Sequence, residues 1–292
     1  MKDVEYCFKG ENRFYWEVMS LRVFISADIE GVAGVVHREH TAREGREHDR
    51  ARMLMTGEVN ACIEGALMAG ATEVVVNDSH GTMRNLIPEA MHPEAEYITG
   101  SPKMLAMMEG IAAGFDAAIF LGYHARMGND GILNHTFHGG VIQNIKINHR
   151  DMGEIGLNAC IAGVFGVPVV LVTGCQHAAN EALEFMPMIE TAVVKQTINR
   201  QTAKHASPQK AKNLIKQKTV EALSRLREMS PVVVQGPFRV EVTYLHSGLA
   251  DAAGILPIVE RVNPTTHRFE TDDFVAAYRY IRSLITIAGA LS

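Results

Sequence analysis

Short apolar runs alternate with longer stretches of helical periodicity along most of the chain. The apolar runs cover residues 21–27, 72–78, 117–123 and 167–174, and they read as buried strands. Apolar residues recur at helical spacing over 55–67, where Gly70 gives a stop signal, and again over 103–112 and 154–166. This alternation predicts an α/β fold with a mostly parallel sheet and helices on both faces.

The pattern changes in the last quarter of the chain. Residues 141–148 alternate as a hairpin or edge strand, and 207–228 form a charged amphipathic helix with Ser207 as N-cap and Pro208 in its first turn. After Pro231 strand-like segments lead to a final helix over 272–289. We therefore expect a catalytic α/β domain over 19–230 and a small α+β C-terminal module over 231–292, with a boundary near 228–236.

Residues 1–18 do not follow this organisation. They mix charged and aromatic side chains without a clear period. They also lack the apolar region and the small-residue cleavage site of a secretory signal. We predict that residues 1–18 are a flexible extension, or a non-native one with Met19 as the true beginning.

The composition excludes several classes of protein. Hydrophobic residues make up 47% and charged residues 21%, which is typical of a globular chain. Lys and Arg number 28 against 33 Asp and Glu, so we expect no nucleic-acid partner. No run reaches the roughly 18 apolar residues of a membrane helix, so we expect no membrane partner. The four cysteines (Cys7, Cys62, Cys160 and Cys175) form no CxxC pair, which favours reduced thiols and a cytoplasmic location.

Potential metal ligands follow three of the predicted strands. SADIEG places Asp28 and Glu30 after the first strand, VNDSH places Asp78 and His80 after the second, and LGYHAR places His124 after the third. Ligands bind at the carboxyl ends of the strands in open α/β sheets. Oxygen and imidazole ligands without a thiolate fit zinc, manganese or iron(II), and zinc is common in hydrolysis.

Two further residues are candidates for the same site. Glu154 opens an apolar helix, where it is either a ligand or a first-turn acid that complements the helix dipole. His135 lies on a Gly-flanked loop 11 residues beyond His124. It is either a group that transfers protons or stabilises an oxyanion, or a solvent-exposed loop residue like His138 and His149.

The densest group of histidines is predicted to stay outside the site. Residues 37–50, HREHTAREGREHDR, do not form HExxH, because His37 and His40 are three residues apart. We interpret this segment as a solvated charged loop that borders the site. The chain also lacks GxGxxG, P-loop and GxSxG motifs.

Taken together, SADIEG, VNDSH, LGYHAR, the following NH and GEIGLNA resemble the bacterial D-aminopeptidase family. AVVKQTINR at 192–200 and the SPxKA stretch at 207–211 extend the resemblance, which covers 21–230 well and the C-terminal module weakly. It implies a zinc peptidase with two divalent metal ions per subunit, which removes N-terminal residues from short peptides and assembles as a homodecameric ring. The implied metal ligands are Asp28, Glu30, His80, His124 and Glu154, and the implied catalytic residue is His135.

Asp28 is the best candidate to bridge two ions, because a carboxylate has two oxygens. Two ions ~3.5–4 Å apart would lower the pKa of a shared water and polarise the scissile carbonyl. His135 would act as nucleophile, proton carrier or oxyanion stabiliser. The alternatives are another metal-dependent hydrolase on the same scaffold, such as an amidase or phosphoesterase, and a non-enzymatic metal- or ligand-binding protein.

Overall fold

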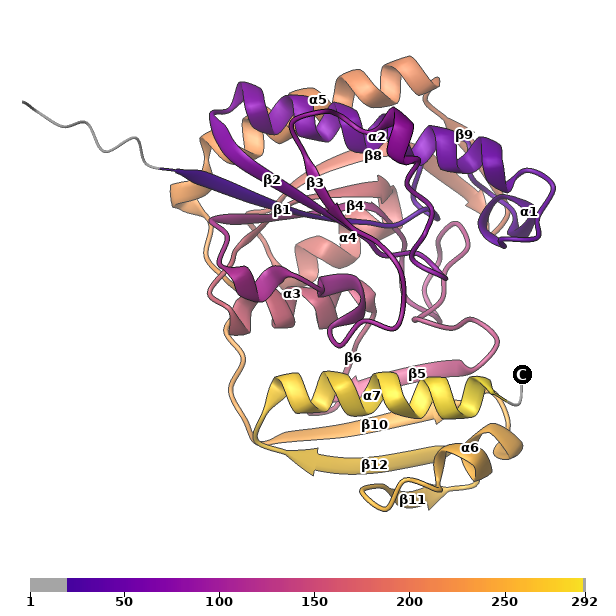
Figure 1. Cartoon of the computed structure of the whole chain (residues 1–292). Helices are drawn as coiled ribbons and strands as arrows, with labels where there is room; N and C mark the ends of the chain where they lie inside the picture. The colour runs from indigo at the N-terminus through magenta and orange to yellow at the C-terminus, as the bar shows by residue number, and fades with distance from the viewer. Residues whose placement is uncertain (1–19, 291–292) are drawn as a thin grey trace, which may run out of the picture.

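A seven-stranded sheet forms the larger part of the molecule (Figure 1). The computed structural model describes residues 20–290, so the predicted extension over 1–18 lies outside the described residues. Neighbouring strands are parallel except for the last pair, which is antiparallel. The strand order is β3 (Glu96–Ile98), β2 (Ala71–Asp78), β1 (Leu21–Ala27), β4 (Ala117–Tyr123), β7 (Val169–Cys175), β8 (Glu190–Asn199), β9 (Thr202–His205).

Helices cover both faces of this sheet, as the alternating pattern predicts. Successive side chains of a strand point to opposite faces. Val23 and Ile25 therefore enter the core beneath α2 (His48–Met68) and α5 (Pro208–Ser224). Phe24 enters the core on the other face, with α3 (Glu154–Val164) and α4 (Gln176–Phe185). The predicted fold class is confirmed.

A second, antiparallel sheet lies below the first (Figure 1). Its order is β11 (Glu260–Asn263), β12 (Thr266–Thr271), β10 (Phe238–Tyr244), β5 (Ile142–Ile147), β6 (Arg150–Asp151). The predicted hairpin over 141–148 is thus β5 and β6, and it pairs with β10 from the C-terminal segment. Strands on both sides of the expected boundary near 228–236 therefore share one sheet, and that boundary stays a prediction.

Helix α7 (Phe274–Gly289) lies between the small sheet and the rest of the molecule (Figure 1). The Asp273 carboxylate caps it by accepting from the Val275 and Ala276 backbone amides, and Ser207 caps α5 by accepting from Lys210. A short helix, α6 (Ser247–Ala253), completes the C-terminal segment. Within residues 20–290 no helix is both long enough and apolar enough to span a membrane.

Two local predictions are wrong. Residues 103–112 form no α-helix but two single 3₁₀ turns, η2 (Ala106–Met108) and η3 (Ile111–Ala113), because Gly110 between them has φ of 98°. Residues 37–50 are a solvated loop only over 42–47, although all of their Arg, Asp and Glu side chains are exposed. The flanking residues form α1 (Arg38–Thr41) and the start of α2, and both His40 and His48 are buried. Two further 3₁₀ turns are η1 (Pro88–Ala90) and η4 (Leu226–Glu228).

Candidate metal centre

The carboxyl ends of β1, β2 and β4 meet at one edge of the large sheet. The backbone ladder continues just past the strands, since Asp28 donates to the Leu121 carbonyl at 2.8 Å and Ser79 donates to Ala27 at 2.8 Å. These bonds fix the backbone on which the next side chains stand. Parallel pairing thus brings Asp28, His80 and His124 together although they are distant in the sequence.

Asp28, Glu30 and His80 form the first of two groups. His80 Nδ1 lies 3.2 Å from Asp28 Oδ1 and 3.0 Å from Glu30 Oε2. One ligand atom from each residue lies within 4.8 Å of the other two. Asp28 and Glu30 are almost fully buried, so their charges are hidden from bulk water.

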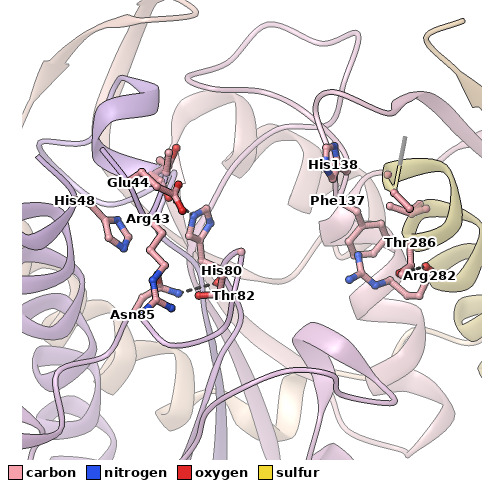
Figure 2. A pocket seen from close by; sticks show the side chains of 16 residues that line it. Arg43, Glu44, His48, His80, Thr82, Asn85, Phe137, His138, Arg282 and Thr286 are labelled. Atoms are coloured by element: carbon pink, nitrogen blue, oxygen red, sulfur yellow. Dashed lines mark hydrogen bonds between the residues drawn. The ribbon is translucent and has the colours of Figure 1, made fainter. Parts of the chain in front are cut away.

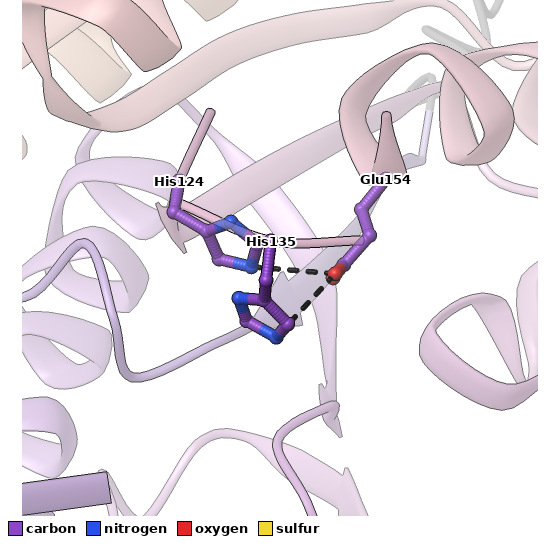
Figure 3. A group of neighbouring side chains, drawn as sticks. All are labelled: His124, His135 and Glu154. Atoms are coloured by element: carbon purple, nitrogen blue, oxygen red, sulfur yellow. Dashed lines mark ion pairs between the residues drawn. The ribbon is translucent and has the colours of Figure 1, made fainter. Parts of the chain in front are cut away.

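His124, His135 and Glu154 form the second group (Figure 3). Glu154 Oε1 lies 3.3 Å from His124 Nε2 and 3.8 Å from His135 Nε2. The two imidazole rings stack with centroids 4.1 Å apart and an angle of 13° between planes. Glu154 stands at the first residue of α3, and its Oε1 also accepts from the Phe137 backbone amide at 2.6 Å.

Asp28 joins the two groups. Its Oδ1 faces His80, and its Oδ2 lies 3.5 Å from His124 Nε2. Each oxygen of one carboxylate therefore faces a different histidine. This is the arrangement expected of a residue that bridges two cations.

Backbone carbonyls orient all three histidines. His80 Nε2 lies 2.8 Å from the Thr41 oxygen, His124 Nδ1 3.0 Å from Ala125, and His135 Nδ1 2.9 Å from Leu133. A ring nitrogen that donates to a carbonyl leaves the other nitrogen with a free lone pair. With a cation bound in place of the proton, we assign this tautomer to each ring, so that His80 Nδ1, His124 Nε2 and His135 Nε2 face the carboxylates.

Three buried polar atoms of the cluster lie at ion-pair distance from other ligand-type atoms but make no hydrogen bond among the described residues: Asp28 Oδ2, Glu30 Oε2 and His124 Nε2. Buried polar atoms are normally paired, and each unpaired one costs about 1–3 kcal/mol. All three are electron-pair donors that zinc accepts. The residues present therefore fit a divalent cation.

Burial and mutual repulsion shape the ionisation of the cluster. Burial raises the pKa of Asp28 to about 7, and the charge of Glu30 adds to this rise. Burial acts in the same direction on Glu30, but the neighbouring histidines outweigh it and hold the pKa of Glu30 well below its usual range. Burial and the charge of His124 lower the pKa of His135.

The nearby carboxylates raise the pKa of His80 and His124, whereas the pKa of His135 is lowered. Burial alone would lower the pKa of each ring. Glu30 and Asp28 overcome this at His80, and Glu154 and Asp28 overcome it at His124, so the pKa of both lies well above the usual range. The carboxylates therefore stabilise a positive charge placed between them.

Lys195 and Glu58 hold the segment that follows β1, and sequence reasoning missed both. Lys195 Nζ, fully buried on β8, donates to the backbone carbonyls of Glu30, Val32 at 2.9 Å and Val35 at 2.7 Å. Glu58 Oε1 accepts from the Ala33 amide at 2.9 Å. Burial lowers the pKa of Lys195 to about 8 and raises that of Glu58 to about 7.

Gly31 allows the same segment to cross very close to the end of β4. Its amide donates to the Gly122 carbonyl at 2.6 Å. A methyl group built on Gly31 would lie 2.2 Å from the Tyr123 carbonyl oxygen and 2.4 Å from the Gly122 carbonyl carbon. Any residue larger than glycine at position 31 would therefore collide with the backbone of β4.

A buried chain of hydrogen bonds runs beneath the cluster. The Tyr278 hydroxyl on α7 donates to Asn158 Oδ1 at 2.8 Å, and Asn158 Nδ2 donates to the Tyr123 hydroxyl at 3.0 Å. The Tyr123 and Ser26 hydroxyls lie 2.7 Å apart, and those of Ser26 and Ser79 lie 2.8 Å apart. Tyr123 precedes His124 and Ser79 precedes His80, so this chain ties α7 to the backbone of the site.

Cavities connect the cluster to the surface. A cavity of about 100 Å³ is lined by Asp28, His80, His135 and Glu154 among others. Larger cavities of about 590 Å³ and 580 Å³ also reach His80. Figure 2 shows the 590 Å³ cavity, with His80, Arg43 and His48 on one side and Phe137, His138 and Arg282 on the other. These volumes suit small-molecule ligands.

The structure brings all six candidate residues into one cluster. Asp78 lies apart from it, because its carboxylate accepts from the Asn85 and Leu86 backbone amides. The segment 37–50 borders the cavities through Thr41 and His48, although neither belongs to the two groups. The ligand and catalytic roles of the six residues stay predictions.

Comparison with known proteins agrees with this geometry. The D-aminopeptidase family, peptidase family M55, matches residues 21–283. A D-aminopeptidase of Bacillus subtilis strain 168 is 39% identical over 269 residues, which is 92% of this chain and 98% of the relative.

A solved structure is also similar. It is the Zn-dependent D-aminopeptidase DppA from Bacillus subtilis, described as a self-compartmentalizing protease. It superposes with a TM-score of 0.90 at 38% identity, over 92% of this chain and 98% of that one. The predicted resemblance is confirmed, and the match extends through the C-terminal segment where the motifs are weak: this chain belongs to the D-aminopeptidase family.

Proposed function

We propose that this protein is a zinc-dependent aminopeptidase that removes N-terminal residues, of D configuration, from short peptides. The observation that carries the proposal is a pair of adjoining groups of metal-type ligands, in which the buried atoms Asp28 Oδ2, Glu30 Oε2 and His124 Nε2 have no hydrogen-bond partner. Its relatives are D-aminopeptidases, so the family supports peptide hydrolysis over an amidase or phosphoesterase activity.

The two groups of side chains suggest two zinc ions per subunit. Glu30 and His80 would hold one ion, His124 and Glu154 the other, and Asp28 would bridge them. Bound ions of this kind supply Lewis-acid polarisation of the peptide carbonyl and lower the pKa of a water molecule. The protein's part is to hold the ligands, through the backbone contacts of the histidines and through Lys195.

His135 is the proposed catalytic residue. It belongs to the second group, but it also lines both the 100 Å³ and the 580 Å³ cavities, so a substrate there can reach it. Its Nδ1 faces the Leu133 carbonyl, which leaves Nε2 to accept or deliver a proton at the leaving amine. A nucleophilic or an oxyanion-stabilising role uses the same atom.

The remaining features of the function are proposed from the relatives. The DppA structure is of a self-compartmentalizing protease, which supports a homo-oligomer here, with a decameric ring as the specific assembly. The cysteines Cys62, Cys160 and Cys175 are buried and unbonded, which supports a reducing cytoplasmic location.

Metal analysis and paired substrates test the function. We expect about two zinc ions per chain. Chelation should abolish hydrolysis and added Zn²⁺ should restore it, and D-aminoacyl peptides should be cleaved in preference to their L counterparts. Fewer than about one tightly bound transition metal per chain, together with hydrolysis that EDTA does not affect, would refute the proposal.

Two variants separate the proposed roles. Asp28→Ala should lose both metal and activity, because the bridge is gone. His135→Ala should retain most of the metal but lower kcat about 10²–10⁴-fold. His246→Ala, an exposed histidine before α6, serves as the matched control and should change neither. Unchanged turnover in His135→Ala would contradict the catalytic assignment.

A further inference from the structure

Arg282 is the one arginine or lysine among the described residues that line the 100 Å³ cavity of the cluster. It stands on α7, outside the motifs that carry the family resemblance. It also lines the 590 Å³ cavity, where it lies across from His80 (Figure 2). Arg282 therefore lines both the 100 Å³ cavity at the cluster and the wider 590 Å³ cavity.

The Arg282 guanidinium has no ion-pair or hydrogen-bond partner within residues 20–290, although it is half-buried. Other arginines in the fold meet carboxylates, such as Arg22 with Glu73 at 2.8 Å and Arg268 with Glu241 at 3.1 Å. An arginine has five N–H donors in a planar fork. In Arg282 this fork is free to bind an anion.

Phe137 fixes Arg282 relative to the cluster. The Arg282 Cζ lies 4.8 Å from the centre of the Phe137 ring, a cation–π contact. The Phe137 backbone amide donates to Glu154 Oε1 at 2.6 Å. Phe137 therefore contacts both the guanidinium of Arg282 and the carboxylate of a proposed metal ligand.

A short peptide carries opposite charges at its two ends. The carboxylates of Asp28, Glu30 and Glu154 favour the amino end at the cluster. The guanidinium fork matches a carboxylate and can donate two parallel hydrogen bonds to it. We propose that Arg282 binds the C-terminal carboxylate of the substrate, so that the enzyme selects short peptides with a free carboxyl end. This inference rests on the proposed aminopeptidase function.

The test compares two substrates that differ only at the far end: D-alanyl-glycine and D-alanyl-glycinamide. The wild-type holoenzyme should prefer the acid about 10- to 100-fold in kcat/KM, the range expected of charge-assisted hydrogen bonds. Arg282→Gln should reduce this preference to near unity, mainly by raising KM for the acid. Arg282→Lys should be intermediate, because it keeps the charge but loses the fork.

Arg279→Gln is the matched control, because it removes the same charge from an exposed position one turn away on α7. It should leave the acid preference unchanged. Bound zinc and the melting temperature are measured for every variant, and Arg282→Gln should keep both near wild-type values.

The outcomes separate the two proposals. If the zinc-loaded wild type cleaves neither substrate, the aminopeptidase function fails and the inference falls with it. If it cleaves the acid and the amide equally, the role of Arg282 is refuted while the function stands. The role is also refuted if Arg282→Gln lowers kcat/KM for both substrates to the same extent. It is refuted as well if Arg279→Gln lowers the preference for the acid as much as Arg282→Gln does.

Discussion

Gly31→Ala gives a direct test of how tightly the site is built. The substitution adds one methyl group to the segment between Glu30 and Val32, where Cβ would lie 2.2 Å from the Tyr123 carbonyl oxygen. An ordinary van der Waals contact begins at 3.4 Å, so the backbone must separate by about 1 Å at this crossing. Both partners are backbone, so no flexible side chain can move aside.

The displacement falls on the proposed ligands themselves. Gly31 follows Glu30 directly, and Tyr123 precedes His124, so the two halves of the cluster move apart. Catalytic constellations tolerate about 0.5 Å, and a misplacement of about 1 Å costs roughly 10²-fold in rate. We therefore expect kcat/KM to fall at least about 100-fold, with weaker zinc binding.

The assay is kcat/KM on a D-aminoacyl peptide at saturating Zn²⁺, with bound metal and the melting temperature recorded. Gly57→Ala is the matched control. Its Cβ would lie 3.6 Å from Lys212 Cδ, an ordinary contact, and alanine favours the α2 helix by up to about 1 kcal/mol. Gly31→Ala enzyme with wild-type activity and metal content would refute the reasoning.

Three further predictions concern stability, measured by urea denaturation of the holoenzyme. Burial raises the pKa of Glu58 from 4.5 to about 7, so between these values the folded chain holds a proton that the unfolded chain releases. Stability should fall as pH rises through this range, by up to roughly 3 kcal/mol, and Glu58→Gln should abolish this part of the pH dependence. An unchanged pH profile would contradict it. Lys195→Met leaves three backbone carbonyls without their donor and should lower the free energy of unfolding by about 3 kcal/mol or more. A loss below about 1 kcal/mol would show that those carbonyls find other partners. Tyr278→Phe removes the hydrogen bond to Asn158 and should cost about 1 kcal/mol, whereas no loss would mean that this bond contributes nothing.

The sequence predicted the site best for residues that directly follow parallel strands. Asp28, His80 and His124 each follow a buried strand, and parallel pairing requires those strand ends to meet. This rule places the cluster without any knowledge of the loops. Glu154 and His135 were harder to assign to the site, because acids at helix N-termini and histidines on glycine-flanked loops are common outside functional sites.

Features that depend on distant packing could not be predicted. Lys195 reaches a backbone segment 160 or more residues earlier, and nothing near it in the sequence marks it as buried. The helix predicted over residues 103–112 is wrong for another reason. Their apolar side chains pack against the core from a non-helical segment that turns at Gly110, and their spacing in the sequence is the same as that of a helix. In residues 37–50 the many charged side chains predicted exposure, and nothing in the sequence indicated that His40 and His48 are buried.

The pairing of β5 with β10 has a consequence for how the enzyme is made. A ribosome releases residues 142–151 long before residues 238–244 exist, and until then β5 has only β6 beside it. Glu154 follows that hairpin by three residues, whereas Arg282 on α7 is synthesised only after residues 238–244. We expect the nascent chain to remain without peptidase activity, and hydrolysis to begin only when helix α7 has been completed and docked.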